Sequence, residues 1–572
     1  MRKLPSQNEH FDAIVVGSGF GGAVMAYRLA EAGQRVCLLE RGKRYPPGSF
    51  ARTPFEMRHN FWRPKKDHYG LFDVWSFDHI DAVVSAGVGG GSLIYANVLI
   101  RKDSDWFDGW PVTRKQLDEH YAAVEKMLAP QVYPRTYQRR NRTSAMQYVA
   151  RELKIRRTTY DKVDPTVPQW YLPQLAVTFQ NPGQPPVPGQ LIQGGEKNIH
   201  HAFRETCRLC GECSVGCNYG SKNTLDFNYL SEAERSSASI CDLCEVESIF
   251  PARRGGRPAY GVEFVARDPR RLAEETRLKI SCDRLVLSCG TFGTALLLFR
   301  SRDKFPALSS TLGTRFSGNG DVLAFVRNCT RRAKDGRPVA VPLNASRAPV
   351  VTSTFRFPDH LDGAPNGKRG FYVQDGGYPL AGDFLWEALQ PAAVVYRFVR
   401  FAWHFIASKL RHRSQTRVGA QLERLIGDAH PSFSSMALLG VGRDVADGEF
   451  ALSDDQRLQL SWRRDKSSHY FAEVDKQAKI IAERMGGTYA ADPLTKLFNR
   501  IITVHPVGGC PMGLTDRDGV VDSNGEVFNY PGLYIADGSV MPGPVGPNPS
   551  FTIAALAEKF AANIISSARP TG

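Results

Sequence analysis

A histidine near the C-terminal end of the chain, His505, is the side chain best suited to proton transfer. It opens the run His505-Pro506-Val507-Gly508-Gly509-Cys510, in which a glycine loop follows an imidazole, the side chain most often used for proton transfer. A single histidine is more often structural than catalytic. Here, however, the glycine loop and the turn motifs after it favour a ligand-binding cleft, so His505 is a candidate acid–base residue.

Two segments that follow His505 also end in groups suited to a ligand site. The apolar run Leu533–Ala536 predicts a buried strand that stops at Asp537-Gly538-Ser539, where a carboxylate or a backbone N–H group can reach a phosphate or a polyol. Asn548-Pro549-Ser550 precedes an apolar helix expected over 551–565, and Asn548 to Ser550 can cap it. The positive end of that helix would stabilise an electron-rich group in the same cleft.

Four cysteines form a second group with chemical potential. Their spacing, Cys207-x-x-Cys210-x-x-Cys213-x-x-x-Cys217, is that of bacterial ferredoxins, except that Asn218 stands where proline usually follows. These thiolates could hold an iron–sulfur cluster, while zinc and free thiols are the alternatives. Cys241 and Cys244 lie three positions apart in an expected strand and so face opposite ways, which favours a buried strand over a metal pair.

A glycine-rich turn near the N-terminus is the element around which these groups must be arranged. The run Ile14–Val16 predicts a buried strand, and Gly17-x-Gly19-x-x-Gly22 then opens a helix that ends at Gly33. In such a turn the first glycine allows the bend, the second lets the backbone approach a pyrophosphate and the third lets helix and strand pack closely. A second strand stops at Glu40, a position where a carboxylate accepts hydrogen bonds from ribose hydroxyls. This stretch predicts that the chain binds an adenine dinucleotide.

Two further glycine turns have the same character. Gly87-Val88-Gly89-Gly90-Gly91-Ser92 can lie flat against a ligand and offer it backbone N–H groups, although a flexible loop is the alternative. Ser288-Cys289-Gly290-Thr291-Phe292-Gly293 joins an expected strand, Leu285–Leu287, to an expected helix, 294–300. That is another strand, turn and helix shaped for a dinucleotide.

In this order, the motifs resemble the glucose–methanol–choline (GMC) oxidoreductases, a family of FAD enzymes that oxidise alcohols. The resemblance spans nearly the whole chain. His505-Pro506-x-Gly508-Gly509, Asn548-Pro549 and the run Val88–Leu93 look most like the cholesterol oxidase branch of that family. The cofactor-binding residues expected from the motifs and the resemblance are Gly17, Gly19, Phe20, Gly22, Glu40, Gly87, Gly90, Gly91, Ser92, Gly290, Asp537, Gly538, Asn548 and Pro549.

The resemblance also implies catalytic roles. His505 would accept or position the alcohol proton, and Asn548 would hydrogen-bond the substrate oxygen and the flavin edge while hydride passes to flavin N5. No histidine lies in the loop 87–92, so the FAD is expected to be non-covalent. Sterol oxidases also carry a glutamate associated with double-bond isomerisation; the matching stretch here offers Gln374 or Asp375 but no glutamate, which leaves that step open.

The expected fold is α/β (α+β overall), with a Rossmann-like FAD-binding domain and a mixed-sheet substrate-binding domain. The FAD-binding domain is expected to comprise residues 8–107, 205–316 and 500–568. The substrate-binding domain, with its covering segments, is expected to comprise residues 108–204 and 317–499. The range Ala238–Ala266 is expected to be rich in strands and to be followed by a charged loop, Arg267–Arg277. A helix capped at Thr113 is expected to run to Leu128.

Composition and charge limit the classes of partner and the cellular location that can be expected. The chain has 572 residues, more than one compact core, and a net charge of +15, which favours acidic partners or anionic membrane surfaces; no nucleic-acid recognition module is evident. Met1–His10 lacks the apolar core of a signal peptide, and no apolar run reaches a membrane-spanning length, so a cytoplasmic or peripheral-membrane enzyme is expected. Val394–Arg413 is basic and aromatic, and either contacts a membrane surface, covers an apolar pocket or packs as an ordinary helix.

Several functions remain open at this point. The first is oxidation of a bulky apolar alcohol, with a sterol favoured and O₂ as acceptor. A variant of it is a long-chain alcohol or other GMC dehydrogenase that passes electrons through an iron–sulfur cluster to a carrier. A redox-neutral lyase or photodecarboxylase on the same fold is an alternative of another class. A pyridine-nucleotide enzyme is disfavoured because the chain lacks a second fingerprint in a separate βαβ unit.

Overall fold

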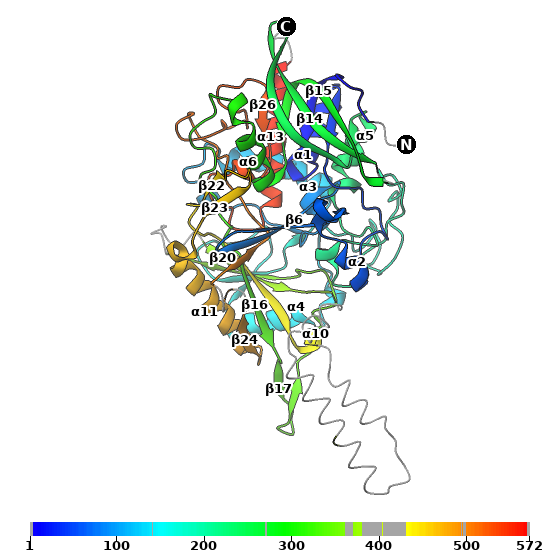
Figure 1. Cartoon of the computed structure of the whole chain (residues 1–572). Helices are drawn as coiled ribbons and strands as arrows, with labels where there is room; N and C mark the ends of the chain where they lie inside the picture. Colours follow the sequence, from blue (N-terminus) through cyan, green and yellow to red (C-terminus); the bar gives the residue numbers. More distant parts are fainter. Residues whose placement is uncertain are drawn as a thin grey trace.

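The computed structural model describes residues 4–139, 141–268, 271–360, 370–379, 403, 431–492, 495 and 499–568. They form two lobes, each built on a seven-stranded sheet, together with two three-stranded and three two-stranded sheets. In Figure 1 the first large sheet lies in the upper half of the molecule and the second in the lower half. The predicted α/β fold, a Rossmann-like sheet with a second lobe on a mixed sheet, is confirmed.

The upper sheet has a parallel core whose strands are buried on both faces. Val15 pairs with Leu38 on one side and with Val286 on the other, and all three side chains are fully buried. Double burial is why these strands are apolar runs without alternation. The parallel strands lie in the order β12 (Ser239–Cys241), β2 (Val36–Leu39), β1 (His10–Val16), β15 (Arg271–Leu287) and β26 (Leu533–Ile535).

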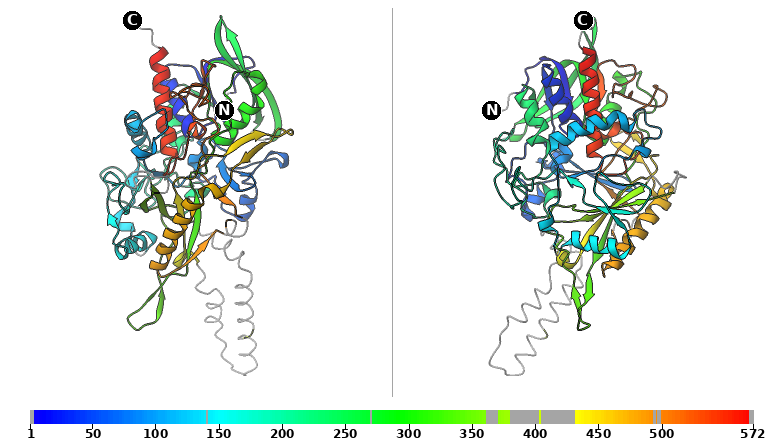
Figure 2. Two further views of the ribbon diagram at one scale, coloured as in Figure 1. Left: turned by 90° about the vertical axis from the view of Figure 1, so that its left-hand side faces the viewer. Right: turned by 180° about the vertical axis from the view of Figure 1, so that it is seen from behind.

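Helices cover this sheet. Helix α1 (Phe20–Glu31) packs on the sheet and on α13 (Ser550–Ala568), which packs in turn on α3 (Arg114–Leu128). Figure 2 shows the red α13 beside the blue α1. The predicted cap and end of α3 are confirmed: Thr113 forms a capping box with Gln116, and the helix runs to Leu128. Its buried residues are Leu117, Tyr121, Val124 and Leu128.

The lower sheet separates a helical layer from the space between the lobes. Helices α11 (Ser468–Arg484) and α4 (Arg142–Glu152) pack on the face into which Ala324 and Val326 point. The alternate residues Leu323 and Phe325 face the opposite way, because successive side chains of a strand point to opposite faces. The strands lie in the order β24 (Thr488–Ala491), β16 (Val322–Arg327), β21 (Met436–Val441), β20 (Gly370–Gly376), β19 (Thr354–Pro358), β10 (Gln169–Tyr171) and β9 (Arg156–Arg157).

One of the three-stranded sheets brings two predicted motifs to one edge. Strand β25 (Ile501–Thr503) runs parallel to β6 (Ile80–Ser85), with Ile501 opposite Ile80 and Thr503 opposite Ala82, and β5 (Phe72–Ser76) pairs on the other side of β6. Parallel strands end at the same edge. The glycine loop after β6 and the His505 segment after β25 therefore emerge next to each other.

The other described elements are shorter or lie at the periphery. They are α2 (Pro54–Arg58), β3 (Trp62–Arg63), β4 (His68–Tyr69), β7 (Val98–Leu99), β8 (Gln131–Val132), β11 (Gln174–Leu175), α5 (Tyr229–Arg235), β13 (Cys244–Arg254), β14 (Arg257–Asp268), α6 (Gly290–Arg300), β17 (Thr330–Arg332), β18 (Pro338–Ala340), α10 (Pro431–Ser434), β22 (Glu449–Leu452) and β23 (Leu458–Ser461). Helix α6 begins at Gly290, four residues before its expected start.

Two local predictions are wrong. The charged stretch Arg267–Arg277, expected as a loop, lies mostly in β14 and β15, whose ends form a largely exposed ribbon. Charged residues suit a ribbon that meets water, and Arg267 pairs across it with Glu275 at 3.0 Å. The stretch 238–250 is two strands, and Leu243 between them has a φ of 53°, so Cys241 and Cys244 belong to different strands.

The segment predicted to contact a membrane surface, residues 394–413, lies outside the described residues except for Trp403. Its role stays a prediction. None of the helices in the described part of the chain combines the length and the apolar character needed to cross a bilayer.

Candidate active site

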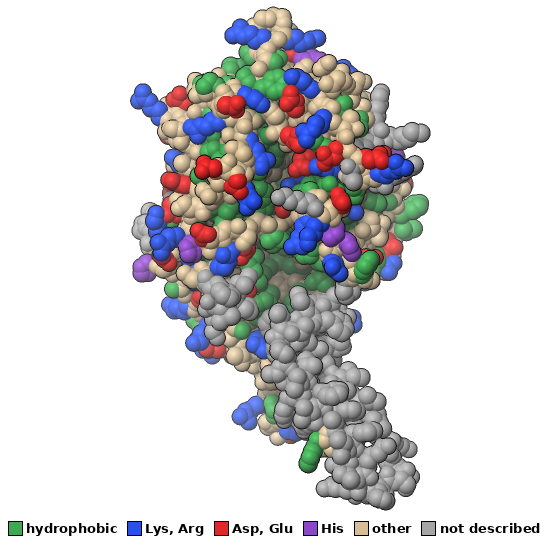
Figure 3. Space-filling view, viewed as in Figure 1, with side chains coloured by type: hydrophobic (Ala, Val, Ile, Leu, Met, Phe, Trp, Pro, Cys, Tyr) green, Lys and Arg blue, Asp and Glu red, His purple; other side chains and the backbone are tan. Residues whose placement is uncertain are grey.

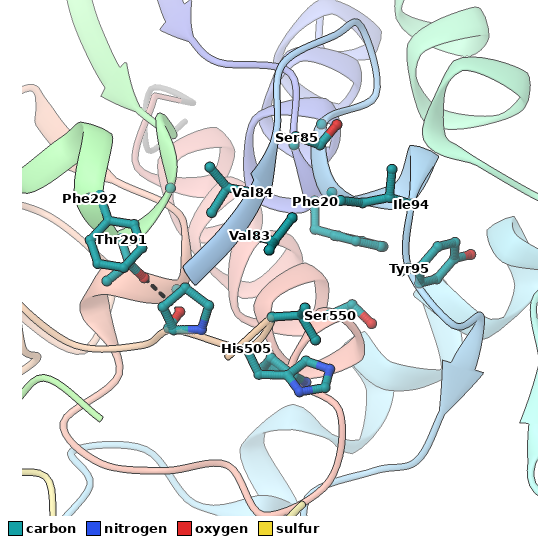
Figure 4. Close-up of a pocket in the computed structure, with 18 of the residues that line it drawn as sticks. Phe20, Val83, Val84, Ser85, Ile94, Tyr95, Thr291, Phe292, His505 and Ser550 are labelled. Carbon is teal, nitrogen blue, oxygen red and sulfur yellow. Dashed lines mark hydrogen bonds between the residues drawn. The ribbon is translucent and has the colours of Figure 1, made fainter. Parts of the chain in front are cut away.

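A cavity of about 790 Å³ lies between the two lobes, within the usual size range of small-molecule sites. The turns after β1, β6 and β15 line it together with the inner face of the lower sheet. Figure 4 shows side chains from separate elements, among them Phe20, Val83, Tyr95 and His505, around this space. The face of the molecule seen in Figure 3 is hollowed near its centre, with apolar side chains in the hollow.

The first glycine turn has the geometry of an anion cradle. Gly17 has a φ of 98°, and a Cβ there would lie 2.2 Å from the carbonyl oxygen of Ser288, so only glycine fits. At Gly19 a Cβ would meet no described atom within 4 Å, which leaves the backbone open to a ligand. Helix α1 starts here, and no described side chain caps its first N–H groups. Such a helix N-terminus favours a phosphate.

The second glycine loop packs directly on the first. A Cβ at Gly90 would lie 2.6 Å from Gly19 Cα, so the backbones of the two turns are in direct contact at this point. Ser18 ties them together: its Oγ accepts a hydrogen bond from Gly89 N–H at 3.0 Å and donates one to Glu40 Oε2 at 2.6 Å. Sequence reasoning missed Ser18, which stands at an unspecified position of the fingerprint.

Two buried carboxylates hold the surrounding turns. Glu40 accepts hydrogen bonds from the N–H groups of Ser18 and Gly42, at 3.0 and 2.9 Å. Asp537 accepts from Gly290 N–H at 2.9 Å and from the Thr294 hydroxyl at 2.6 Å, so it fixes the start of α6. Burial raises the pKa of both carboxyls. Both line the cavity. Glu40 accepts three hydrogen bonds and keeps one lone pair for a ligand hydroxyl, whereas Asp537 also accepts from the N–H and the hydroxyl of Ser539, at 2.8 and 2.6 Å, and has none left.

The imidazole of His505 is oriented by an aspartate that the sequence did not reveal. Asp321 Oδ1 lies 2.7 Å from His505 Nδ1. The other oxygen of Asp321 accepts hydrogen bonds from Val504 N–H and from the Thr503 hydroxyl, both at 2.9 Å. A carboxylate on Nδ1 keeps the proton on that nitrogen and leaves the lone pair of Nε2 free to accept another proton.

Asn548 lies on the Nε2 side of the imidazole. Its Nδ2 is 3.2 Å from His505 Nε2, and its Oδ1 accepts a hydrogen bond from Gln374 Nε2 at 3.0 Å. These partners fix the orientation of the Asn548 amide. Because of this orientation, Asn548 keeps an N–H group next to the basic nitrogen of His505. The side-chain oxygen of Gln374, Oε1, is buried and has no hydrogen-bond partner among the described residues.

A single turn, residues 317–321, which directly precedes β16, positions both His505 and Asn548. Asn319 Oδ1 accepts hydrogen bonds from Val545 N–H and Gly546 N–H, at 2.7 and 3.2 Å, and its Nδ2 donates to Pro547 O at 3.1 Å. Asn319 thus holds the loop that carries Asn548, while Asp321, two residues on, holds His505. The polar run 317–321 in front of an apolar strand was the available sequence signal.

Most of the predicted site residues line the cavity: Gly17, Gly19, Phe20, Glu40, Gly90, Gly91, Gly290, His505, Asp537, Gly538, Asn548 and Pro549. Gly22, Gly87 and Ser92 lie behind it. A Cβ at Gly22 would be 2.0 Å from Gly17 O, so Gly22 serves helix packing, and the Ser92 hydroxyl donates to Gly89 O at 2.7 Å within its own loop.

Beyond His505, the cavity is walled by apolar side chains of the lower sheet. The cavity-facing positions of β16 and β21 are Leu323, Phe325, Ala437, Leu439 and Val441. Val350 and Trp75 extend this wall. Polar side chains near it include Gln374, Tyr378, Arg327 and Ser435. The space next to the histidine thus suits a large apolar molecule.

The four cysteines 207–217 line a second, small cavity. Cys207 and Cys213 are buried, and Cys210 and Cys217 are half-buried. All four are free thiols in this structure. Within the described part of the chain, no three His, Cys, Asp or Glu side chains are placed to hold one metal ion.

Comparison with known sequences gives these features a context. Two sequence profiles described as GMC oxidoreductase match residues 11–303 and 464–557. A cholesterol oxidase from Acinetobacter baumannii is 27% identical, with 96% of this chain and 94% of that protein covered. A cholesterol oxidase from Mycobacterium tuberculosis is 28% identical, with 96% and 90% covered. A long-chain-alcohol oxidase from Arabidopsis thaliana is 22% identical, with 96% and 65% covered.

Solved structures match the fold along the whole chain. Formate oxidase from Aspergillus oryzae has a TM-score of 0.57 at 14% identity, with 99% of both chains covered. Pyridoxine 4-oxidase from Mesorbium loti has a TM-score of 0.56 at 15% identity, with 96% and 98% covered. At these identities the likeness concerns the fold alone.

Proposed function

The chain belongs to the GMC oxidoreductase family, and from this premise we propose that it oxidises the hydroxyl group of a bulky apolar alcohol, with a sterol favoured. Membership makes it an FAD-dependent oxidoreductase that acts on CH–OH groups. The finer assignment is supported by one observation above all. The histidine–asparagine pair opens onto a cavity that has glycine turns at one end and an apolar wall at the other.

The residues present fit FAD. Gly17, Gly19 and the start of α1 would hold the pyrophosphate, and Glu40 would meet the ribose. Gly90, Gly290 and Gly538 offer bare backbone around the rest of the cavity. Binding is expected to be non-covalent, since the loop 87–92 carries no histidine. When bound, FAD supplies the hydride acceptor at N5.

The chain's own groups handle the proton. His505 Nε2, left unprotonated because Asp321 holds the proton on Nδ1, accepts the hydroxyl proton of the alcohol. Asn548 Nδ2, 3.2 Å from that nitrogen, donates a hydrogen bond to the same oxygen as negative charge develops on it.

A sterol is favoured over a linear alcohol because the cholesterol oxidases match both chains nearly end to end, at 27–28% identity. The long-chain-alcohol oxidase, at 22%, supports the second candidate, a long-chain alcohol. The reduced flavin would then pass its electrons to O₂ or to a carrier. The residue beside Asn548 is Gln374, an amide without basicity, and Asp375 is buried in an ion pair with Arg142 at 2.8 Å. The proposed enzyme therefore leaves a sterol's double bond in place.

Turnover with cholesterol, a long-chain primary alcohol and a short alcohol tests this assignment. The expected product is the sterol ketone with its double bond unmoved. Ala437→Phe, on the cavity wall, should slow the sterol far more than the short alcohol. The matched variant Ala451→Phe, on the exposed side of β22, should slow neither. Equal effects of Ala437→Phe on the sterol and the short alcohol, or an isomerised product, would contradict the proposal.

A further inference from the structure

The apolar wall of the large cavity ends in an arginine. Along β16, Leu323, Phe325 and Arg327 all line the cavity. The residues between them, Ala324 and Val326, belong to the core on the helix side of the sheet. A strand sends every second side chain to the same face, so Arg327 lies on the same face as Leu323. The wall is therefore apolar where it begins near His505 and cationic at its far end.

The strand sets the distance between these two ends. Asp321, which orients His505, directly precedes β16, and Arg327 is the last residue of that strand. A strand rises by about 3.3 Å per residue, so the steps from Val322 to Arg327 cover about 16 Å. A sterol ring system with a short side chain is of comparable length. A substrate whose hydroxyl meets His505 can therefore place its other end at Arg327.

A buried hydroxyl lies at the same end of the wall. Ser435 directly precedes β21, whose first residue, Met436, pairs with Val326. Ser435 also lines the cavity, and its Oγ accepts a hydrogen bond from Asn328 N–H at 3.1 Å. Ser435 is only 8% exposed, and its O–H group can still donate. Arg327 and Ser435 thus bring N–H and O–H donors to one end of the cavity.

The charge at this end suits an anion better than a hydrocarbon. Among the described residues that the lower sheet and the turn 317–321 contribute to the cavity, Asp321 is the single carboxylate, and it is engaged with His505. An apolar tail over Arg327 would strip water from the guanidinium without replacing the lost hydrogen bonds, whereas a carboxylate replaces them. A guanidinium has five N–H donors, so it can bind a carboxylate through two of them and keep a further partner.

We propose that the substrate is a bulky apolar alcohol that carries a carboxylate at the end opposite its hydroxyl, and that Arg327 and Ser435 bind this carboxylate. The inference rests on the proposed alcohol oxidation and narrows its substrate class. Arg327 forms a two-pronged, charge-assisted hydrogen bond, and Ser435 donates a further one. The net charge of +15 favours the approach of such an anion. Cholesterol, which lacks the carboxylate, remains a substrate with a higher KM.

Two sterols that differ in this group alone test the proposal. Hydroxycholenoic acid and its methyl ester share the ring system and the hydroxyl, and the ester lacks the negative charge. The wild type should oxidise the acid with a kcat/KM about 10- to 100-fold above that for the ester, the range expected for hydrogen bonds to a charged group, and the difference should lie in KM. Both sterols are assayed as dissolved monomers without detergent or vesicles, so that a lipid surface plays no part.

Three variants assign the preference to the arginine. Arg327→Met removes the charge from a side chain of similar length, so the ratio of kcat/KM between acid and ester should fall to about one. Arg327→Lys keeps the charge without the planar fork and should give an intermediate ratio. Arg332→Met removes an arginine from the exposed strand β17 and serves as the matched control, with the wild-type ratio. If Arg327→Met loses FAD because it does not fold, Ser435→Ala carries the test and should lower the ratio by about 10-fold.

Equal kcat/KM values of the wild type for acid and ester, or a wild-type preference retained in Arg327→Met, would overturn the carboxylate site. A binding measurement separates that failure from a failure of the proposed function. The keto form of the acid has no hydroxyl left to oxidise, and calorimetry should show that it binds about 10- to 100-fold more weakly to flavin-loaded Arg327→Met than to the wild type. Such weakened binding, without oxidation of either sterol, would support the site and remove the proposed oxidation.

Discussion

Asp321 decides what the imidazole of His505 can do. A histidine without a partner on Nδ1 can carry its proton on either nitrogen, whereas the 2.7 Å contact with Asp321 fixes the tautomer and strengthens the base. Asn548 is fixed in the same way by Gln374. The reactive pair is therefore held by two other side chains before any ligand arrives, which is the preorganisation that catalysis requires.

Replacing His505 by alanine should remove the proton acceptor and leave the cofactor cradle intact. Flavin reduction by the alcohol should slow by about 10²- to 10⁴-fold, the usual contribution of a general base, while FAD stays bound. Anaerobic stopped-flow absorbance measures the rate, and the ratio of flavin to protein absorbance measures occupancy. A reduction rate equal to that of the wild type would remove His505 from the mechanism.

Asp321→Asn tests the positioning role. The amide keeps the shape but no longer holds the Nδ1 proton electrostatically, so flavin reduction should slow by about 10- to 100-fold. The base should also become weaker, which moves the acid limb of the pH–rate profile to lower pH. An altered rate with an unmoved acid limb would mean that Asp321 serves packing alone.

At the scale of elements, the turn 317–321 links the lower sheet to the reactive pair. It is braced by Asp444, whose carboxylate accepts hydrogen bonds from the Ser317 hydroxyl and from Gly318 N–H, the latter at 2.8 Å. Burial raises the pKa of Asp444 to about 7. Its neighbour Asp321 adds like charge in the same direction.

The raised pKa of Asp444 predicts a pH dependence of stability. The folded chain binds this proton more tightly than the unfolded chain, so its contribution is complete below about pH 4 and is lost as pH rises through about 7. The change is on the order of a few kcal/mol. Asp444→Asn should flatten the fall in unfolding temperature between about pH 4 and 7. Parallel curves for variant and wild type would refute this assignment.

At the scale of the molecule, the cavity proposed to hold FAD lies between the lobes and is lined by segments from both ends of the chain. A ligand that binds only the folded state stabilises it by mass action. Removal of FAD should therefore lower the unfolding temperature, and excess FAD should restore it. At an FAD concentration 1,000 times the dissociation constant, the free energy of unfolding should rise by about 4 kcal/mol. Differential scanning fluorimetry checks this. An unfolding temperature that is independent of FAD would contradict the placement of the cofactor.

The sequence predicted the parts of this molecule that local chemistry dictates. Gly17, Gly19 and Glu40 could be predicted because the cradle is formed by a strand, a turn and a helix that are consecutive in the sequence. His505 and Asn548 were readable through motifs. Asp321 and Asn319 were not, because their roles depend on contacts with residues about 180 to 230 positions away. The ribbon of β14 and β15 was missed because exposed strands carry the same charges as loops.

The most direct test of the central claim is the visible spectrum of the purified chain during an anaerobic titration with cholesterol. The account predicts a yellow protein whose flavin band is bleached as the sterol is added, with one ketone formed for each flavin reduced. A colourless chain that takes up no added FAD, or a bound flavin that neither the sterol nor any other alcohol bleaches, would contradict it.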